Sequence, residues 1–378
     1  MADKRLRVGV VFGGRSGEHE VSLAGAASVM AAIDRARFDV VPIGIAKDGR
    51  WLVGGDPLRA LGREAARLAL AEGGAEAQTK RELLDRAAAG EATSALARME
   101  SSEGLPAGLR ESLDVVLILL HGPQGEDGTI QGLFELAGVP FVGSGCAASA
   151  VGMDKAFMKG VFASVGLAQA QYRVILHYQR ERARSMVEPL GLPLFVKPAN
   201  LGSSVGVSKV KRWEELDEAL DLAFEYDRKI VVEEGLDARE IELGILGNEE
   251  PEASVVGEIV PDREFYDYDS KYSAESRTEL RIPAPLSAAE AREARELGVR
   301  VFQAVDASGY ARIDFLMDRK TGKMYVNEIN TIPGFTSISM FPKLWGAAGL
   351  DYDDLLSRLV ELGLERHHQR RGLRTDYR

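Results

Sequence analysis

The most informative stretch of the sequence is Arg312-Ile-Asp-Phe-Leu-Met-Asp-Arg-Lys-Thr-Gly-Lys-Met-Tyr-Val-Asn-Glu-Ile-Asn330. Polar and apolar residues alternate in its two arms, which is typical of strands with one buried face, and the Thr-Gly pair between them suits a turn. If the arms pair symmetrically about this turn, Arg312 lies opposite Asn330 and Asp314 lies opposite Glu328. Opposed carboxylates repel each other unless a cation lies between them. We therefore expect a cation with oxygen ligands here, as Mg²⁺ on nucleotide phosphates requires, the simpler alternative being a solvated polar sheet face.

On both sides of this hairpin, strand-like and helix-like segments alternate. The N-terminal part predicts strands at residues 7–12, 38–45, 114–120 and 139–142, and helices at 22–33 and 129–137. The central part predicts helices at 147–159, 178–187 and 214–224, and strands at 194–197, 205–210 and 229–233. The C-terminal part adds strands at 241–246 and 254–260, a helix at 288–305, the hairpin and a helix at 353–362. Alternation of this kind is typical of an α/β protein.

The length of 378 residues predicts two or three domains. We expect an N-terminal α/β domain at 1–143, a central lobe at 144–235, a C-terminal lobe at 236–364 and a frayed polar tail at 365–378. Residues 54–108 are rich in Ala, Glu, Arg and Leu and lack strand-like runs. They predict a helical insert in the first domain.

Composition narrows the function classes. The formal net charge of −11 disfavours nucleic acid as a partner, because an acidic surface repels a phosphate backbone. The single cysteine, Cys146, excludes an intramolecular disulfide, a cysteine-rich zinc site and an iron–sulfur cluster held by this chain alone. No signal-peptide core follows Met1, and the longest compact apolar run, residues 115–120, is too short to span a bilayer. We expect a cytoplasmic protein without a membrane partner.

A glycine loop follows the strand predicted at 194–197. Its sequence, Lys197-Pro-Ala-Asn-Leu-Gly-Ser-Ser-Val-Gly206, combines a lysine with backbone N–H groups that can cover phosphates, although it can also be an ordinary strand connection. It is not a Walker A sequence. Gly202 to Gly206 also matches a hydrolase nucleophile elbow, but a strand rather than a helix is predicted next, and the only histidines downstream of Ser204 that could complete a triad lie in the tail. Gly143-Ser-Gly-Cys-Ala-Ala148 resembles a dinucleotide fingerprint but follows a very short strand.

Further polar clusters lie where loops leave predicted strands, the edge at which α/β sheets collect ligands. They are Gly13-Gly-Arg-Ser-Gly-Glu-His-Glu-Val-Ser22 and His121-Gly-Pro-Gln-Gly-Glu-Asp-Gly128. Two more motifs are a loop dense in aromatic and charged residues, Phe265-Tyr-Asp-Tyr-Asp-Ser-Lys-Tyr272, and the end of the hairpin with its Pro-Gly turn, Glu328-Ile-Asn-Thr-Ile-Pro-Gly334. Glu20 or Ser22 can instead cap the following helix, and the tyrosine-rich cluster can be a plain surface loop.

Together with Met153-Asp-Lys155, these motifs in this order resemble the D-alanine–D-alanine ligase family of the ATP-grasp superfamily. The resemblance runs from Gly13 to the final helix, apart from the 54–108 insert and the tail. It implies an N-terminal Rossmann-like pre-ATP-grasp domain followed by a two-lobed ATP-grasp domain with α+β lobes.

The resemblance also implies residue roles. Metal ligands would be Asp314, Glu328 and Asn330, with two Mg²⁺ ions bridged by Glu328 and Mn²⁺ able to substitute. ATP would contact Lys155, Lys197, Ser203, Ser204, Glu233, Glu234, Leu236, Glu240, Phe265 and Lys271. D-Alanine would contact Glu18, His121, Ser339 and Met340. Catalysis would use Arg312 and the Gly334 N–H on the tetrahedral intermediate, and a hydrogen-bonded triad of Glu18, Ser203 and Tyr272 that closes the site.

The implied reaction is ATP-dependent ligation of two D-alanines through a D-alanyl phosphate, for peptidoglycan precursor synthesis, by an enzyme that is usually a homodimer. Tyr272 favours the dipeptide over D-alanyl-D-lactate as product. The alternatives are an ATP-grasp ligase with D-lactate or D-serine as second substrate, a non-catalytic nucleotide-binding or scaffold protein, and a serine hydrolase using Ser204.

Overall fold

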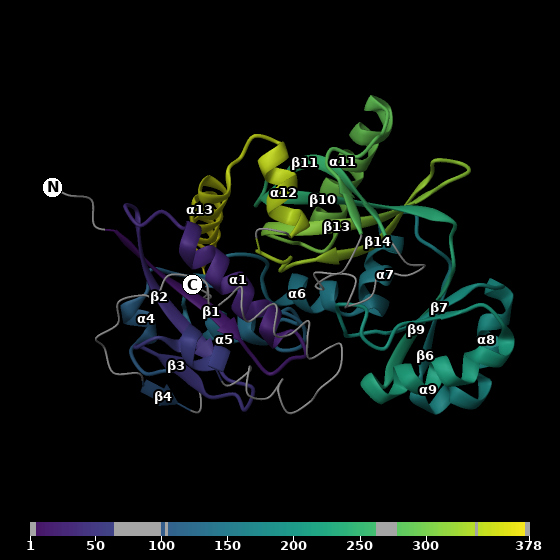
Figure 1. The fold of residues 1–378 in the computed structure, drawn as a ribbon, viewed down its shortest axis with the longest axis horizontal. Helices are drawn as coiled ribbons and strands as arrows, with labels where there is room; N and C mark the ends of the chain where they lie inside the picture. The colour runs from purple at the N-terminus through teal and green to yellow at the C-terminus, as the bar shows by residue number, and fades with distance from the viewer. Residues whose placement is uncertain (1–4, 64–99, 103–104, 262–277, 337–338, 375–378) are drawn as a thin grey trace.

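The computed structural model describes residues 5–63, 100–102, 105–261, 278–336 and 339–374. Strands in these residues form three sheets, which lie in three parts of the molecule (Figure 1). No helix among them is long and apolar enough to cross a membrane.

The first sheet is the N-terminal unit and has the order β4-β3-β2-β1-β5. Its strands are β1 (Leu6–Gly13), β2 (Phe38–Ile45), β3 (Trp51–Val53), β4 (Glu100–Ser102) and β5 (Val115–Ile118). β1 pairs in parallel with β2 and β5. Val8, Val10 and Val11 are fully buried, so both faces of β1 are covered, as is usual for parallel strands.

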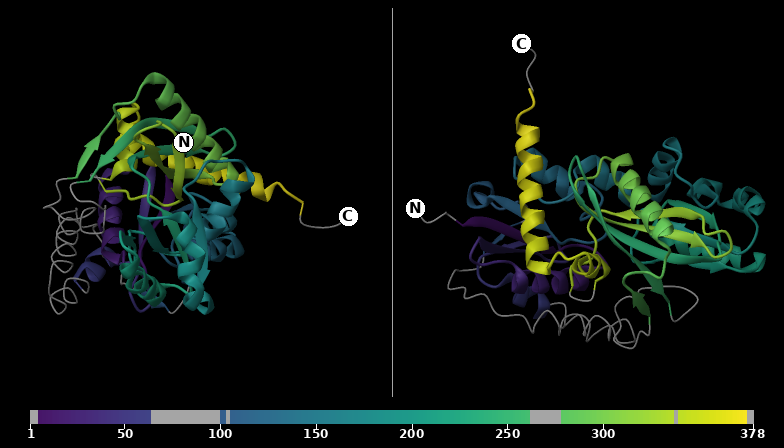
Figure 2. Two further views of the ribbon diagram at one scale, coloured as in Figure 1. Left: turned by 90° about the vertical axis from the view of Figure 1, so that its right-hand side faces the viewer. Right: turned by 90° about the horizontal axis from the view of Figure 1, so that it is seen from above.

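Helices cover this sheet. They are α1 (His19–Ala32), α4 (Leu109–Ser112), α5 (Thr129–Ala137) and, from the far end of the chain, α13 (Tyr352–Arg371). Leu355 and Leu359 of α13 belong to the same apolar core as Val8 and Phe12 of β1. The last turns of α13 project from the body of the molecule (Figure 2).

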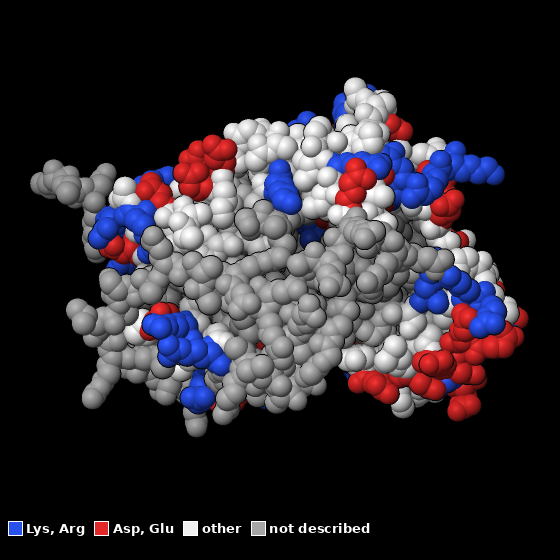
Figure 3. Space-filling model, in the orientation of Figure 1, with Lys and Arg blue, Asp and Glu red and all other residues white. Residues whose placement is uncertain are grey.

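The second sheet forms the central lobe and is antiparallel, in the order β6-β9-β7-β8. Its strands are β6 (Tyr172–Leu176), β7 (Leu194–Pro198), β8 (Ser208–Val210) and β9 (Lys229–Glu234). α8 (Ala183–Val187) and α9 (Leu216–Tyr226) pack on it. Acidic side chains gather over this lobe on the face shown in Figure 3, so part of the acidic excess lies on this outer surface.

The third sheet is antiparallel in the order β12-β11-β10-β13-β14. Its strands are β10 (Ala238–Gly247), β11 (Glu252–Val260), β12 (Glu279–Arg281), β13 (Gly309–Asp318) and β14 (Met324–Asn330). α11 (Ala288–Ala304) packs on the face that carries Leu243, and α12 (Met340–Ala347) packs on the opposite face at Gly244. Glu242 and Arg312 share the Gly244 face, since residues two apart on a strand point the same way and Arg312 pairs with Gly244.

The structure corrects several expectations about helices. The helix expected at 147–159 is two helices, α6 (Cys146–Met153) and α7 (Lys155–Ser164), because the Asp154 side chain accepts hydrogen bonds from the N–H groups of Ala156 and Phe157 and starts a new helix. The segment expected at 178–187 begins as a 3₁₀-helix, His177–Arg182. The tail expected to be frayed from residue 365 continues α13 to Arg371, because Arg366 and Arg370 bind Glu135.

Three further expectations were also wrong in part. The insert expected to be helical includes β4, which pairs with β3, while residues 64–99 lie outside the described residues. The strand expected at 205–210 is only β8, because Gly206 has a left-handed backbone angle (φ of 69°) that is incompatible with an extended strand. The strand expected at 139–142 is reduced to one parallel bridge, between Val116 and Phe141.

Candidate active site

Two cavities that share part of their wall lie between the three units. The smaller, of about 140 Å³, is lined by residues of all three. The larger, of about 580 Å³, extends between the second and third sheets. Residues common to both linings include Lys155, Ser203, Glu242, Arg312 and Glu328. A ligand in one cavity would therefore lie next to a ligand in the other, beside these side chains.

The hairpin pairing expected from the sequence is confirmed. Arg312 pairs with Asn330 and Asp314 pairs with Glu328, and the register shifts directly after Asp314. Each of these two carboxylates has a cationic partner. The Arg312 guanidinium donates two hydrogen bonds of 2.7 Å to Asp314, and the Lys155 Nζ lies 3.5 Å from Glu328.

Glu242 joins this cluster and was missed by the sequence analysis. β10 places it opposite Asp314, on the other side of β13 from Glu328, and its Oε2 lies 3.0 Å from the Arg312 Nε. The apolar residues Ile241 and Leu243 on either side would have marked Glu242 as facing away from the core. Burial alone would lower the pKa of Arg312, but Asp314 and Glu242 raise it well above its ordinary value. Arg312 thus stays charged at the boundary of the two cavities.

The turn after β1 places Glu18 at the smaller cavity. Gly13 has a φ of +94°, and a Cβ there would lie 2.2 Å from the carbonyl oxygen of Ile45, so only glycine fits. The Ser22 hydroxyl accepts a hydrogen bond from the Gly13 N–H (2.8 Å) and donates one to the Leu119 carbonyl (2.6 Å). Ser22 therefore joins the ends of β1 and β5 rather than capping a helix, since α1 begins earlier than expected, at His19.

Glu20 does not cap a helix either, because it pairs with a lysine in the loop after β2. Its carboxylate is buried and pairs with Lys47 at 2.8 Å.

At the cavity itself, the Glu18 carboxylate accepts a hydrogen bond from the Ser203 hydroxyl of the glycine loop. Two of the three residues of the expected triad are thus in contact, and the third, Tyr272, lies outside the described residues.

The loop after β5 brings two titratable groups to the same cavity. His121 is buried, and burial lowers its pKa, although the nearby Glu18 charge opposes this. Glu126 accepts a hydrogen bond of 2.7 Å from the Gly122 N–H, and burial together with the Glu18 charge raises the pKa of Glu126 to about 8. Glu126 lies in the motif at residues 121–128, but nothing in the sequence indicated that it belongs to the site. Its acidic neighbourhood was not apparent because Glu18 is far away in sequence.

Lys155 and Lys197 line the other cavity, and the buried Lys159 contacts the lining residue Glu233. The Lys155 Nζ donates a hydrogen bond of 2.7 Å to the Leu201 carbonyl. The Lys197 Nζ lies 2.9 Å from one oxygen of Glu233, and the Lys159 Nζ lies 3.0 Å from the other. Burial would raise the pKa of Glu233, but Lys197 and Lys159 lower it to about 2. The carboxylate therefore remains charged although it is buried.

The remaining residues expected at the nucleotide line this same cavity. They are Ser203, Ser204, Glu234, Leu236 and Glu240. Glu234 accepts a hydrogen bond of 2.8 Å from the Gln171 N–H. Phe265 and Lys271 lie outside the described residues.

Residues after the hairpin form the far wall of the smaller cavity. Gly334, Ser339 and Met340 line it. The Ser339 hydroxyl accepts a hydrogen bond of 3.1 Å from the Thr336 N–H and lies 2.7 Å from the Thr336 hydroxyl. A Cβ at Gly334 would lie 2.9 Å from the Ser339 Oγ, so a side chain at residue 334 would crowd this wall.

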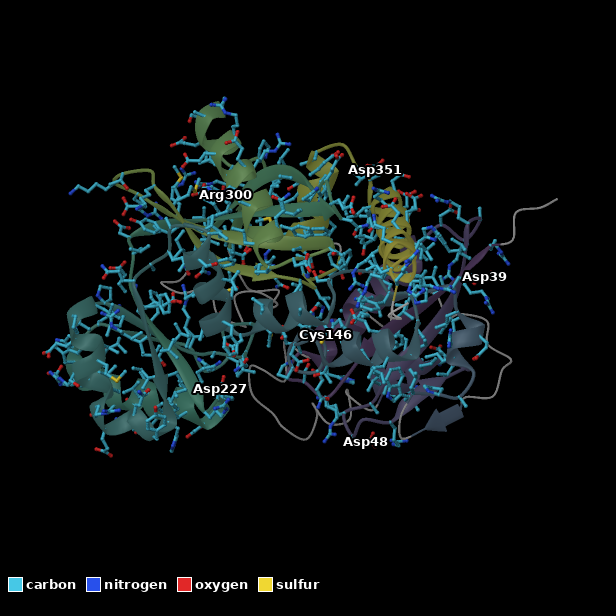
Figure 4. All side chains as sticks on the ribbon, turned by 180° about the vertical axis from the view of Figure 1, so that it is seen from behind. Asp39, Asp48, Cys146, Asp227, Arg300 and Asp351 are labelled. Atoms are coloured by element: carbon cyan, nitrogen blue, oxygen red, sulfur yellow. The ribbon has the colours of Figure 1, made fainter. Side chains whose placement is uncertain are left out.

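The cation site suggested by the hairpin consists of two carboxylates and an amide. The described residues contain no group of three or more His, Cys, Asp or Glu side chains that could hold a metal by themselves. Asp314, Glu328 and Asn330 offer hard oxygen ligands at the cavity boundary, and such ligands suit Mg²⁺ when phosphate oxygens complete its coordination. Cys146 begins α6 near the middle of the molecule (Figure 4) and lines neither cavity.

Comparison with known proteins gives the same answer for both halves of the chain. Residues 7–144 match the family described as D-ala D-ala ligase N-terminus, and residues 161–361 match D-ala D-ala ligase C-terminus. The D-alanine–D-alanine ligase of Heliobacterium modesticaldum is 48% identical over 374 residues, which cover 98% of this chain and 97% of the relative. The corresponding ligase of Geobacillus kaustophilus is 44% identical with the same coverage.

Solved structures are similar over nearly the whole chain. The D-alanine–D-alanine ligase from Coxiella burnetii has a TM-score of 0.75 at 32% identity and covers 97% of this chain and 96% of its own. The VanG D-Ala:D-Ser ligase from Enterococcus faecalis has a TM-score of 0.76 at 31% identity, with 95% and 100% covered. The chain belongs to the D-alanine–D-alanine ligase family.

Proposed function

We propose that the protein joins two D-alanines into D-alanyl-D-alanine with conversion of ATP to ADP and phosphate, through a D-alanyl phosphate, in peptidoglycan precursor synthesis. The observation that carries this proposal is the common wall of the two cavities, formed by Lys155, Arg312 and Glu328. Acyl phosphate chemistry needs a carboxylate to meet a phosphoryl group, and cations between them offset the charge repulsion. The wall provides these cations.

The larger cavity suits ATP. Lys155 and Lys197 lie where phosphates would be neutralised, and Glu233, Glu234, Leu236 and Glu240 would contact adenine and ribose. Asp314, Glu328 and Asn330 would hold two Mg²⁺ ions, for which Mn²⁺ can substitute. When bound, these ions supply Lewis-acid stabilisation of the transferring phosphoryl group.

The smaller cavity suits the amino acids. Glu18 would bind the ammonium of the first D-alanine, with His121 beside it, while Ser339 and Met340 would bind the second. Arg312 and the Gly334 N–H would stabilise the tetrahedral oxyanion. The amine of the second D-alanine attacks the acyl carbon and phosphate leaves, so no protein nucleophile is needed.

Water must be excluded while the acyl phosphate exists, because hydrolysis would waste it. The Ser203 loop fits this role, since it contacts Glu18 across the cavities and holds two successive non-glycine residues at positive φ, 48° for Ser203 and 61° for Ser204. Phe265, Lys271 and Tyr272 would contribute a second lid, with Lys271 near the γ-phosphate.

A second candidate is ligation of D-alanine to D-serine, which the similarity to the Enterococcus ligase favours. D-Lactate is a third possible acceptor. The curated relatives at 44–48% identity favour D-alanine. A phosphate-release assay with each acceptor, at neutral pH and with product identification by mass spectrometry, tests this. Turnover with D-serine or D-lactate but not with D-alanine would overturn the proposed acceptor, and ATP binding without D-alanine-dependent ADP release would overturn the enzyme activity.

We further propose that the three sheets correspond to an N-terminal domain (1–143) and two lobes (144–235 and 236–364), and that the protein is a cytoplasmic homodimer. The domain division is supported by the three separate sheets. Light scattering after size-exclusion chromatography measures the oligomeric state, and a mass of one chain would contradict the dimer.

A further inference from the structure

Among the described residues, Glu233 pairs with two lysines, of which one lines the ATP cavity and the other does not. Glu233 and Lys197 line that cavity, whereas Lys159 does not. The Lys159 side chain is 1% exposed, and its Nζ binds Glu233 from behind at 3.0 Å, while Lys197 binds the other carboxylate oxygen at 2.9 Å. Lys159 follows Lys155 by four residues on α7, so the same helix provides a lysine to the cavity and one to the interior.

This arrangement contains more positive charge than Glu233 needs. One carboxylate lies between two ammonium groups, and a single lysine would compensate it. Burying a second ammonium group costs free energy, which one carboxylate shared between two lysines offsets only in part. The Lys159 Nζ has a second favourable contact, at 5.2 Å from the centre of the Tyr172 ring, which helps to stabilise an ammonium in the interior.

The second ammonium group beside Glu233 becomes important when a polyphosphate enters the cavity. Lys197 must then shift its interaction from Glu233 towards phosphate oxygens. If Lys197 were the only partner of Glu233, this shift would leave a buried carboxylate without compensation, and the carboxylate would compete with the phosphates for the lysine.

We propose that Lys159 is a positioning residue that keeps Glu233 compensated and in place, so that Lys197 can turn to the phosphates of the bound nucleotide. The proposal deepens the proposed function and rests on its nucleotide site. The lowered pKa of Glu233, caused by Lys197 and Lys159 against the effect of burial, agrees with a carboxylate that stays ionised.

Lys159→Met tests the proposal through binding rather than turnover. We expect the Kd of ADP to rise about tenfold or more, because Lys197 remains with Glu233, and the Kd of adenosine to change less than about twofold, because adenosine has no phosphates. Both are measured by calorimetry on the full chain with Mg²⁺ and without D-alanine. Lys159→Gln is the second variant if Lys159→Met does not fold.

Glu233→Gln should abolish the effect of Lys159→Met on phosphate binding. Without the carboxylate, Lys197 is free whether or not Lys159 is present. The ratio of adenosine Kd to ADP Kd in the double variant Lys159→Met/Glu233→Gln should therefore equal that of Glu233→Gln alone within about threefold. Lys229→Met is the matched control, since Lys229 is also buried but pairs one-to-one with Asp154, and its variant should leave the ratio unchanged.

Other results would overturn the proposal. Equal losses for ADP and adenosine in Lys159→Met would make Lys159 a structural support only, and no loss would remove it from the nucleotide site. A phosphate-specific loss that persists in the double variant would show that Lys159 acts independently of Glu233. A wild-type chain that binds neither ADP nor adenosine would overturn the nucleotide site and this inference together, whereas intact binding without D-alanine turnover would overturn the ligase activity alone.

Discussion

The N-terminal and C-terminal sheets supply the site in different ways. In the N-terminal sheet, the loops that follow the parallel strands β1 and β5 supply Glu18 and His121. The antiparallel C-terminal sheet supplies Glu242, Arg312 and Asp314 directly from one face of its strands. On the strand face, the alternation of side chains and the pairing of the backbones set the positions of the residues. In the loops, the positions depend on tertiary contacts. Changes on the face should therefore affect chemistry, and changes in the loops should affect binding and stability as well.

Glu328→Gln should have the largest effect and tests the strand face. We expect kcat to fall about a thousandfold, because a carboxylate that would hold metal is lost. The melting temperature of the ligand-free chain should change little, because removing the charge that opposes Asp314 offsets the loss of the ion pair with Lys155. Steady-state kinetics and differential scanning calorimetry measure the two effects. A decrease in melting temperature that parallels the activity loss would indicate that Glu328 serves folding instead.

Arg312→Lys tests the same face with the charge retained. We expect kcat to fall about a hundredfold, since a lysine cannot make the paired hydrogen bonds that the guanidinium makes to Asp314, nor bind an oxyanion in the same way. Nucleotide affinity, measured by calorimetry, should change much less. Kinetics equal to the wild type would remove Arg312 from the reaction.

Glu126→Gln tests the loop after β5 through pH. The pKa of Glu126 is raised from 4.5 to about 8 in the folded chain, mainly by burial. Glu126 therefore loses its proton at a lower pH in the unfolded chain than in the folded chain. Its contribution to the free energy of unfolding is complete below the unfolded pKa and is lost as pH rises towards the folded pKa. Between about pH 5.5 and about pH 7 the free energy of unfolding of the wild type falls by about 2 kcal/mol through this group. The Glu126→Gln variant should not show this decrease.

Urea unfolding of the wild type and of Glu126→Gln across this pH interval measures that difference. Asp127→Asn is the neighbouring control, because Asp127 lies in the same loop and its carboxylate binds the N–H groups of Gln124 and Thr129. Parallel pH dependences in wild type and Glu126→Gln would contradict the raised pKa.

Glu18→Gln tests the loop after β1. The amide keeps the size of the side chain and can still accept a hydrogen bond from Ser203, but it loses the charge that would bind an ammonium. We expect the KM of the first D-alanine to rise about tenfold, with a smaller change in kcat. Initial rates at varied D-alanine measure this. An unchanged KM with a lowered kcat would assign Glu18 to chemistry rather than binding.

Ser22→Ala should have the smallest effect and tests the connection between the two loops. The change leaves the buried Gly13 N–H and Leu119 carbonyl without this hydroxyl, so the free energy of unfolding should fall by about 1 kcal/mol. Urea unfolding at neutral pH measures it. Ser22→Thr, which keeps the hydroxyl, is the control, and equal loss in both variants would attribute the effect to packing.

Some features of the fold were predictable because their signal is local. The pairing of Asp314 with Glu328 follows from alternation and a turn within nineteen residues, from Arg312 to Asn330. The break between α6 and α7 was missed, but the signal was present, since Asp154 is a strong helix N-cap residue. β4 had no such signal: Glu100–Ser102 has no apolar pattern, and the strand exists because backbone groups pair with the sheet edge.

The sequence by itself determined the family and the hairpin register, because these depend on motifs and on short-range periodicity. Every residue that it assigned to the site and that the structure describes lines one of the two cavities. Tertiary structure alone decided which charges meet. Glu242 reaches Arg312, Glu126 comes near Glu18, and Lys159 lies behind Glu233 only after the sheets have packed. The partners in each pair are between about 70 and 110 residues apart in the chain, and no local pattern specifies a contact between groups so distant in sequence.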